Sequence, residues 1–288
     1  MKWLVADSLS CPEQFFASHL DSYSHFLREA GEDALAAEVG VAGDFRFDPD
    51  WEHAPDELPD VGDIDIVFML DRYHWQSAFP RHVKRVAQVA AVCSPMPWEV
   101  RKPDGSPAFD LVLSSIPSMV EQARAAGCRA EYMPLAFDLR ARACGMGVKR
   151  DLGCIFIGSV GSNHRRRTEL LRELSDVVTV MPAVYGREMF RTLARARVVF
   201  NPHAEWAGGI KNNMRSFEAS GMMATVVTDA APAPEFVPGR VFTDAASARE
   251  MIRLSLADDY GSLDSYETLA RGTYESRIPR LLEIARSL

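Results

Sequence analysis

The sequence lacks the features of several common protein classes. Its five cysteines are odd in number and include no C-x-x-C pair, which argues against a disulfide framework and a structural zinc site. No apolar run approaches the ~18 residues that a membrane span needs. The opening MKWLVADSLS has too few apolar residues for a signal-peptide core. We therefore expect a cytoplasmic protein without a membrane span.

Two phosphate-binding motifs are also missing. The chain contains no G-x-x-x-x-G-K-S/T, so it has no Walker A loop. It contains no G-x-G-x-x-G either, which weakens a dinucleotide-binding interpretation. Any phosphate site in this chain must therefore be built in another way.

The length and charge of the chain indicate two domains of different character. A chain of 288 residues suits two domains of ~140 residues, and 47% hydrophobic and 25% charged residues are typical of a globular protein. Up to Asp138 the chain holds 23 acidic and 11 basic residues, a net charge of −12, and the remainder holds 17 and 21, a net charge of +4. This asymmetry argues against a nucleic-acid partner and allows an anion site in the second half.

Apolar runs alternate with helix-like segments in both halves of the chain. Such alternation predicts α/β domains with buried strands. Strands are expected at residues 2–6, 64–70, 86–92, 111–113, 130–133, 152–157, 177–181, 198–200 and 224–227. Between the halves, residues 134–150 (PLAFDLRARACGMGVKR) lack apolar periodicity and contain two glycines, so we expect a hinge there.

The stretch VVFNPHAEWAGGIKNNMRSFEASGMMATVVTD, residues 198–229, predicts a strand, a loop, a helix and a second strand. Its loop follows the carboxyl end of the first strand, where open α/β sheets bind ligands. Charged and amide side chains are dense in this stretch, and they are Glu205, Lys211, Asn213, Arg215 and Glu218.

The charges in this stretch suit a phosphorylated sugar. Lysine and arginine beside a helix N-terminus favour a phosphate, because backbone N–H groups and the helix dipole also attract negative charge there. Glu218, one turn further into the helix, can accept hydrogen bonds from a pair of sugar hydroxyls. The alternative is an exposed helix face on which Arg215 and Glu218 form an i,i+3 ion pair.

A second candidate phosphate-binding element follows the strand expected at residues 152–157. Gly158 and Ser159 begin a short Gly/Ser loop, and Arg166 lies in the arginine-rich helix start after it. Glycines let backbone amides approach a diphosphate, and the helix start adds its dipole. The alternative is an arginine-rich helix start that is exposed to solvent.

Several segments resemble those of one known family. R-S-F-E-A-x-G, followed by an apolar strand and Thr-Asp, resembles the carboxyl-terminal half of GT-B glycosyltransferases, most closely the CgeB-like group. The segments DLVLSSIPSMVEQARAAGCRAEYMPLAFD, IFIGSVGSNHRRRTELL and GTYESRIPRLLEIARSL are similar to other parts of that group. The resemblance covers most of the chain and is weak before Asp63.

The resemblance implies an α/β architecture of the GT-B type, with two Rossmann-like domains that face each other across a cleft and a C-terminal helix that crosses back. The implied division is 1–138 for the acceptor-side domain, 139–150 for the linker, 151–271 for the nucleotide-sugar-binding domain and 272–288 for the crossing helix. The implied activity is glycosyl transfer from a nucleotide-diphosphate sugar to a hydroxyl acceptor, a small molecule or a glycan, without a cofactor.

The resemblance also implies the residues of the donor site. Lys211, Arg215 and Arg166 would stabilise the leaving diphosphate. Glu218 would bind the ribose, and the backbone of residues 184–186 would contact the nucleobase. The expected donor-site residues are Gly158, Ser159, Arg166, Val184, Tyr185, Gly186, Glu205, Lys211, Asn213, Arg215 and Glu218.

We expect no metal, because helix amides and cations can neutralise the diphosphate. Asp48-Pro49-Asp50 spells the metal-chelating D-x-D motif of a different glycosyltransferase architecture. That motif follows a buried strand there, whereas here it lies in an acidic, turn-prone stretch, so we discount it.

The stereochemical course stays open. Retaining GT-B enzymes with two glutamates eight residues apart would need an acid at Ile210, and Glu205 could serve only if the loop is longer. If the enzyme inverts, the base is His74 or Asp71, just after the strand expected at residues 64–70, because imidazole titrates near neutrality. The alternative for His74 is a loop histidine bonded to solvent or backbone.

Two other functions fit the same patterns. One is a nucleotide-sugar epimerase of the same architecture. The other is a non-catalytic nucleotide-sugar-binding protein with a degenerate acceptor side.

Overall fold

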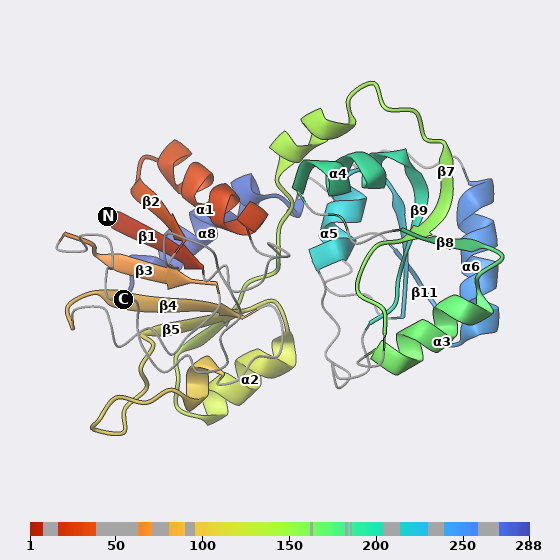
Figure 1. Cartoon of the computed structure of the whole chain (residues 1–288). Coiled ribbons are helices and arrows are strands. Elements are labelled where there is room, and N and C mark those ends of the chain that lie inside the picture. The colour runs from red at the N-terminus through yellow and green to blue at the C-terminus, as the bar shows by residue number, and fades with distance from the viewer. Residues whose placement is uncertain are drawn as a thin grey trace. The chain divides into compact units, whose positions relative to one another are not determined.

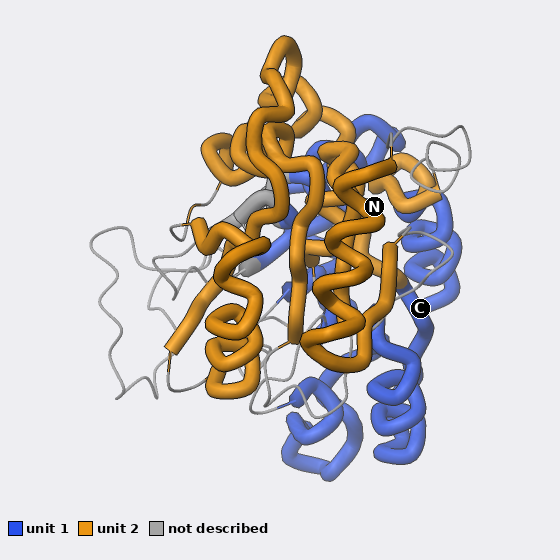
Figure 2. Tube along the Cα trace, turned by 90° about the vertical axis from the view of Figure 1, so that its right-hand side faces the viewer, with its two compact units in different colours: residues 1–133, 277–288 blue, residues 134–276 orange. Residues whose placement is uncertain are grey.

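The computed structural model describes residues 1–7, 17–38, 63–70, 81–89, 96–161, 164–181, 184, 186–203, 214–229, 239–258 and 271–288. The chain divides into two compact units, residues 1–133 with 277–288 and residues 134–276, which Figure 2 colours separately. Within the described ranges, no helix is long and apolar enough to cross a membrane.

The first unit contains a six-stranded parallel sheet (Figure 1). All residues of β3 and β5 are buried, which explains their continuous apolar runs. The strands lie in the order β2 (Asp33–Glu38), β1 (Lys2–Asp7), β3 (Ile66–Met69), β4 (Lys84–Val89), β5 (Leu111–Ser114) and β6 (Ala130–Tyr132). Among the described residues of this unit, the helices are α1 (Ala17–Glu29), α2 (Pro117–Ala125) and most of α8 (Tyr274–Ala285), with the 3-10 helix η2 (Pro97–Glu99).

The second unit contains a five-stranded parallel sheet. Its strands lie in the order β11 (Gly239–Val241), β10 (Thr225–Thr228), β9 (Ala196–Asn201), β7 (Leu152–Phe156) and β8 (Val178–Val180). The described part of this unit contains the helices α3 (Arg165–Glu173), α4 (Gly186–Arg195), α5 (Met214–Gly221) and α6 (Ala245–Ala257), with the 3-10 helix η3 (Leu139–Gly145). The prediction of two α/β domains with parallel sheets is confirmed.

Both faces of the second sheet are covered by helices (Figure 1). Ile155 and Val199 point to one face, where they pack with Leu193 of α4. Their neighbours Phe156 and Phe200 point to the other face, where α3 and α6 pack. Because successive side chains of a central strand alternate between two buried faces, the buried parts of β7 (CIF) and β9 (VVF) are continuous apolar runs.

Two strands were missing from the sequence-based prediction, β2 and β11. Both lie at an edge of their sheet. Leu35 of β2 is 45% exposed and Val241 of β11 is 46% exposed. The sequence of β11 (GRV) is short and has no apolar run, and that of β2 (DALAAE) is rich in alanine and leucine, which favour a helix over a strand.

Residues 134–150, where we expected a hinge, lie within the second unit. Ala141 and Val148 pack against the core cluster that includes Leu193. Arg142 Nε donates to the carbonyl of Gly221 at 3.0 Å, and Arg150 Nη2 donates to the carbonyl of Met222 at 2.7 Å. These arginines bind the carbonyl groups at the C-terminus of α5, which satisfies acceptors that the helix leaves open.

Among the glycines that the structure describes, Gly221 leaves the least room for a Cβ atom. A Cβ atom at Gly221 would overlap the ring carbons of Phe137, and Phe137 is itself buried in the core. We expect Gly221→Ala to lower the free energy of unfolding by about 1–3 kcal/mol, because overpacking outweighs the ~1 kcal/mol that alanine gains over glycine in a helix. Urea unfolding measures the change.

Gly153→Ala is the matched control for this substitution. The nearest atom to a Cβ at Gly153 is Leu256 Cδ2 at 4.0 Å, an ordinary contact, so this variant should keep the wild-type stability. Equal stabilities of the two variants would contradict the packing argument.

Candidate functional site

The carboxyl ends of β7, β9 and β10 meet at one edge of the second sheet, because the three strands are parallel neighbours. Residues 158–159 follow β7, residues 201–203 end and follow β9, and residues 228–229 end and follow β10. We call these three segments, with the first turn of α3, the carboxyl edge. Ligands of open α/β sheets bind in this position.

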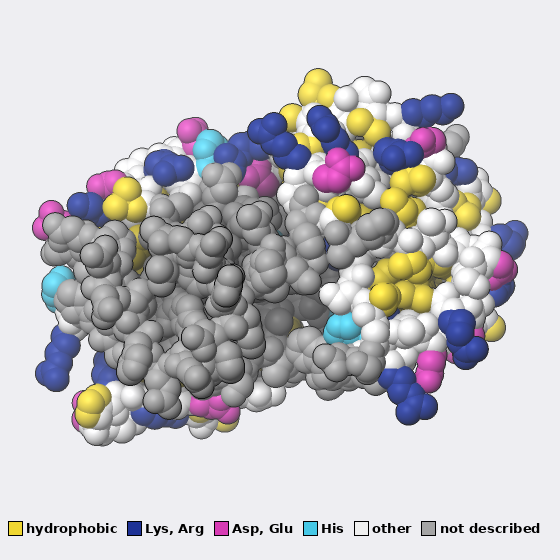
Figure 3. Space-filling model, in the orientation of Figure 1, with side chains coloured by type: hydrophobic (Ala, Val, Ile, Leu, Met, Phe, Trp, Pro, Cys, Tyr) yellow, Lys and Arg dark blue, Asp and Glu magenta, His cyan; other side chains and the backbone are white. Residues whose placement is uncertain are grey.

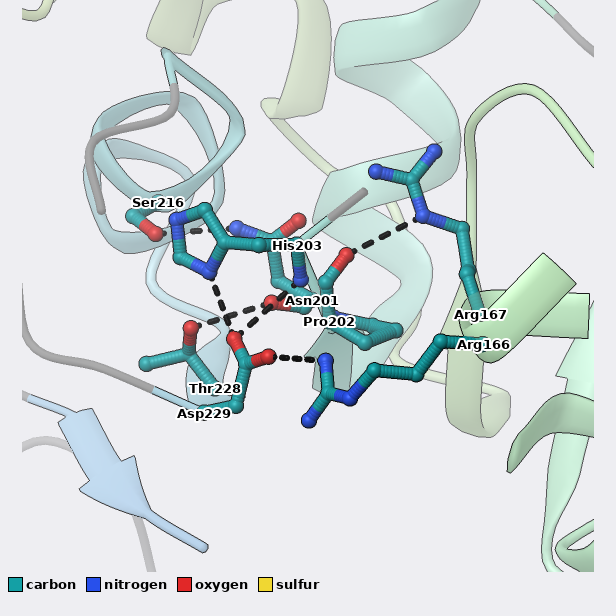
Figure 4. Close-up of polar contacts among 8 residues, drawn as sticks. All are labelled: Arg166, Arg167, Asn201, Pro202, His203, Ser216, Thr228 and Asp229. Atoms are coloured by element: carbon teal, nitrogen blue, oxygen red, sulfur yellow. Dashed lines mark hydrogen bonds and ion pairs between the residues drawn. The ribbon is translucent and has the colours of Figure 1, made fainter. Parts of the chain in front are cut away.

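Asp229 is the centre of the polar contacts at the carboxyl edge (Figure 4). Its Oδ1 accepts a hydrogen bond from the backbone N–H of His203 at 3.1 Å and lies 2.5 Å from His203 Nδ1. Its Oδ2 accepts from Arg166 Nη1 at 2.5 Å. One carboxylate therefore joins β10 to the segment after β9 and to α3.

The charge state of Asp229 follows from these contacts. Its side chain is 8% exposed. Burial by itself raises the pKa of Asp229, but the hydrogen bonds and charges of His203 and Arg166 outweigh it and hold the pKa well below its usual range. Asp229 is thus ionised at neutral pH.

One ring nitrogen of His203 contacts Asp229, and the other has no hydrogen-bond partner among the described residues. Nδ1 faces Asp229, whose carboxylate can only accept, so Nδ1 carries the hydrogen. Nε2 is buried and has no hydrogen-bond partner among the described residues. The side chain is 8% exposed. A buried polar atom without a partner costs about 1–3 kcal/mol, so Nε2 is the atom of this edge most in need of a ligand.

Arg167 holds two loops of the carboxyl edge together. Its Nε donates to the carbonyl of Pro202 at 3.1 Å, and its Nη1 donates to the carbonyl of Ser159 at 3.0 Å. Its guanidinium lies 5.6 Å from the centre of the Phe156 ring. Burial lowers the pKa of Arg167 and Asp229 raises it to a smaller extent, but an arginine stays charged at neutral pH.

Buried hydrogen bonds attach the start of α5 to the same edge. Asn201 Nδ2 donates to Ser216 Oγ at 2.9 Å, and Thr228 Oγ1 donates to the carbonyl of Asn201 at 3.0 Å. All three residues are buried. The first turn of α5 is therefore fixed to the ends of β9 and β10.

The Arg215–Glu218 pair is present, but it is not exposed. Arg215 Nη1 donates to Glu218 Oε2 at 2.7 Å, and the two side chains are 12% and 9% exposed. Arg215 also contacts the sulfur of Met189. Burial raises the pKa of Glu218, and Arg215 opposes this to a smaller extent. The alternative of an exposed ion pair on a solvated helix face is therefore wrong.

The structure places other expected donor-site residues as follows. Gly158 packs closely on the Phe156 ring, which leaves little room for a side chain. Gly186 begins α4 with φ of 57°, a conformation that favours glycine. Val184 packs against the core of the second unit. Outside the described residues lie Asp71, His74, Tyr185, Glu205, Lys211 and Asn213.

Sequence reasoning did not assign His203, Arg167 and Asp229 to the site. His203 and Asp229 are 26 residues apart and became partners only when β9 and β10 paired. Their positions in the sequence could have indicated the site, because Asp229 directly follows β10 and His203 lies two residues after the end of β9. Polar residues at the carboxyl ends of neighbouring parallel strands lie close together.

No group of three or more His, Cys, Asp or Glu side chains that could hold a metal ion occurs within the described ranges. The D-x-D at residues 48–50 falls outside these ranges.

Comparison with known proteins defines the fold. No protein-family model matches the chain, and no curated protein matches its sequence. The structure is similar to AviGT4, a glycosyltransferase involved in avilamycin A biosynthesis, at 16% identity over 99% of this chain and 97% of that chain, with a TM-score of 0.63. The chain has the GT-B fold.

Other GT-B proteins align over the same extent. Sucrose-phosphate synthase from Thermosynechococcus elongatus is 12% identical over 100% of this chain and 99% of that chain, with a TM-score of 0.60. An alpha-glucosyltransferase in complex with UDP-glucose and DNA containing an abasic site is 10% identical over 99% of both chains, with a TM-score of 0.59. At these identities the similarity concerns the GT-B fold, and the CgeB-like assignment stays a prediction.

The Asp229 contacts predict a pH-dependent contribution to stability. The pKa of Asp229 is lower in the folded than in the unfolded chain, where it is about 3.9. The carboxylate therefore stabilises the fold above about pH 4, and this stabilisation is lost as the pH falls towards the folded-state pKa. We expect Asp229→Asn to cost about 1–3 kcal/mol near neutral pH and less in acid, as measured by urea unfolding across this range.

Asp176→Asn is the control for this measurement. Asp176 forms an exposed ion pair with Arg249, and such pairs contribute little. A constant difference between the wild type and Asp229→Asn at every pH would show that Asp229 acts through shape and not through its charge.

Proposed function

We propose that this chain is a glycosyltransferase that moves a glycosyl group from a nucleotide-diphosphate sugar to a hydroxyl acceptor. The observation that carries the proposal is the GT-B fold, shared with AviGT4 and sucrose-phosphate synthase over nearly the whole length of both chains. The buried polar contacts lie at the carboxyl edge of the second sheet, where a ligand of such a sheet binds. Because the similar alpha-glucosyltransferase holds UDP-glucose, a UDP-sugar is the first donor to test.

In this proposal the diphosphate binds without a metal. The N-termini of α3 and α5 direct backbone N–H groups and positive dipole ends at the ligand. Lys211, Arg215 and Arg166 supply positive charge, and the loops at residues 158–159 and 184–186 bring backbone amides. Their combined charge opposes the negative charge that develops on the leaving diphosphate. The sequence segments that carry the resemblance favour the CgeB-like group within this fold.

Glu218 is proposed to bind the ribose. Its carboxylate is oriented by Arg215, which donates to Oε2 and leaves Oε1 available. A buried carboxylate that is already oriented loses little conformational entropy when it accepts a hydroxyl. The Arg215–Glu218 ion pair is therefore compatible with ribose binding by Glu218.

The acceptor is proposed to be a hydroxyl group of a small molecule or a glycan, with His74 or Asp71 as the base if the enzyme inverts. The first 138 residues carry a net charge of −12, which opposes binding of a nucleic acid. On the face shown in Figure 3, described Lys and Arg side chains are dispersed among acidic ones and do not form one basic patch. Acidic surroundings favour a neutral or cationic acceptor over an anionic polymer.

A nucleotide-sugar epimerase is the second candidate. A putative UDP-N-acetylglucosamine 2-epimerase from Listeria monocytogenes is 13% identical over 100% of this chain and 96% of that chain, with a TM-score of 0.50. The two activities differ in products, so one assay separates them.

We expect incubation with a suitable UDP- or GDP-sugar and a panel of hydroxyl acceptors to release the nucleoside diphosphate, because transfer breaks the bond between the sugar and the diphosphate. Chromatography of the mixture measures the released nucleoside diphosphate. The assay is run with and without a metal chelator to test whether transfer needs a metal ion. An isomerised sugar nucleotide would show an epimerase. Binding without turnover would show a non-catalytic binding protein.

Glu218→Gln tests the ribose contact. An amide oxygen accepts from Arg215 but lacks the charge that strengthens a hydroxyl–carboxylate hydrogen bond, so we expect the affinity for a nucleoside diphosphate to fall about tenfold or more. Calorimetric titration measures the affinity. Glu250→Gln, an exposed position on α6, is the control and should bind like the wild type. Unchanged affinity of Glu218→Gln would remove Glu218 from the site.

A further inference from the structure

A buried polar atom of the carboxyl edge, Nε2 of His203, is not used by the proposed function. His203 Nε2 has no hydrogen-bond partner among the described residues, and the His203 side chain is 8% exposed. We propose that His203 donates a hydrogen bond from Nε2 to the terminal phosphate of the nucleoside diphosphate, and that Asp229 is the positioning residue that holds the ring for this contact. This inference rests on the proposed function and adds a residue to it.

The ring of His203 cannot turn freely. Asp229 Oδ1 lies 2.5 Å from Nδ1 and also accepts from the backbone N–H of the same histidine. Arg166 holds the other oxygen of the carboxylate, so Asp229 is fixed from both sides. Figure 4 shows Nδ1 turned to Asp229 and Nε2 on the opposite side of the ring. The direction of the open nitrogen is therefore set before a ligand binds.

The charges around His203 favour a phosphate over a neutral hydroxyl. The first turn of α3 brings Arg166 and Arg167 to this edge, along with the positive end of the helix dipole. His164, which precedes α3, forms no side-chain cap to the helix. Among the described residues that bond to one another at the carboxyl edge, Asp229 is the one carboxylate facing these two guanidinium groups. An anionic ligand compensates the excess positive charge.

The contact needs hydrogens on both ring nitrogens. Nδ1 keeps its hydrogen and donates a hydrogen bond to Asp229, so a second hydrogen on Nε2 makes the ring an imidazolium, whose charge Asp229 offsets. During transfer, the bond between the sugar carbon and the phosphate oxygen breaks and its electron pair stays on the phosphate. The hydrogen bond from His203 strengthens as this charge develops, and no bond to the histidine forms.

A pair of variants separates ligand binding from a structural role. His203→Asn places an amide nitrogen near the position of Nδ1, so it keeps a donor to Asp229 and loses the donor at Nε2. His203→Gln places an amide nitrogen near the position of Nε2 and keeps that donor. We expect His203→Asn to bind UDP or GDP about ten to a hundred times more weakly than the wild type, and His203→Gln to bind within a few-fold of it.

The corresponding nucleoside monophosphates locate the contact on the nucleotide. The terminal phosphate is absent from UMP and GMP, so their affinities should be the same in His203→Asn and in the wild type. Calorimetric titration with all four nucleotides gives these values. A variant His203→Asn that still prefers diphosphates to monophosphates as the wild type does would overturn the proposal. Loss of both kinds of affinity together with a lowered melting temperature would assign His203 a structural role and would also overturn it.

A measurement on the unsubstituted protein covers the case in which His203→Asn does not fold. The seven histidines can be labelled with 15N and observed by NMR spectroscopy. The Nε2 resonance that is present in the wild type and absent from His203→Gln belongs to His203. UDP or GDP should shift this resonance and the monophosphate should not. A wild type that binds neither diphosphate would remove the proposed function as well, whereas binding without a shift would remove only this inference.

Discussion

The arrangement of the carboxyl edge depends on the buried carboxylate of Asp229, which accepts hydrogen bonds from Arg166 and His203. A carboxylate that is 8% exposed is stable only if cations and donors replace its water. The donors come from Arg166 on α3 and from the ring and backbone of His203 after β9. The need to satisfy one buried charge thus fixes the positions of three segments that are far apart in the sequence.

The arginines around this carboxylate have different roles. Arg167 gives its hydrogen bonds to two backbone carbonyls and fixes the loops after β7 and β9. Arg166 neutralises Asp229 and remains 43% exposed on its side chain, within reach of solvent or a ligand. Arg215 orients Glu218 on α5. Such prior orientation is what a site for a charged substrate needs, because groups that are already aligned lose less entropy on binding.

The central strands could be predicted, because strands buried on both faces require continuous apolar runs such as IVFM in β3 and LVLS in β5. The GT-B architecture was predicted from the resemblance of several sequence segments to that family. Edge strand β2 (DALAAE) was missed because its alanine and leucine residues favour a helix, and edge strand β11 (GRV) was missed because it is short and has no apolar run. The packing of residues 134–150 was missed for a related reason. Their contacts come from arginine side chains on helix-end carbonyls and from a 3-10 helix, neither of which produces an apolar period.

The sequence by itself determined the alternation of strands and helices, the two-domain α/β architecture and the concentration of ionic groups near the end of β9, because each depends on local pattern and composition. The tertiary structure decided which of those groups became partners. It joined His203 to Asp229, buried the Arg215–Glu218 pair and left Nε2 of His203 without a hydrogen-bond partner among the described residues. Side chains that are distant in sequence meet only through strand pairing and helix packing, so burial and partnership at the site follow from the folded arrangement.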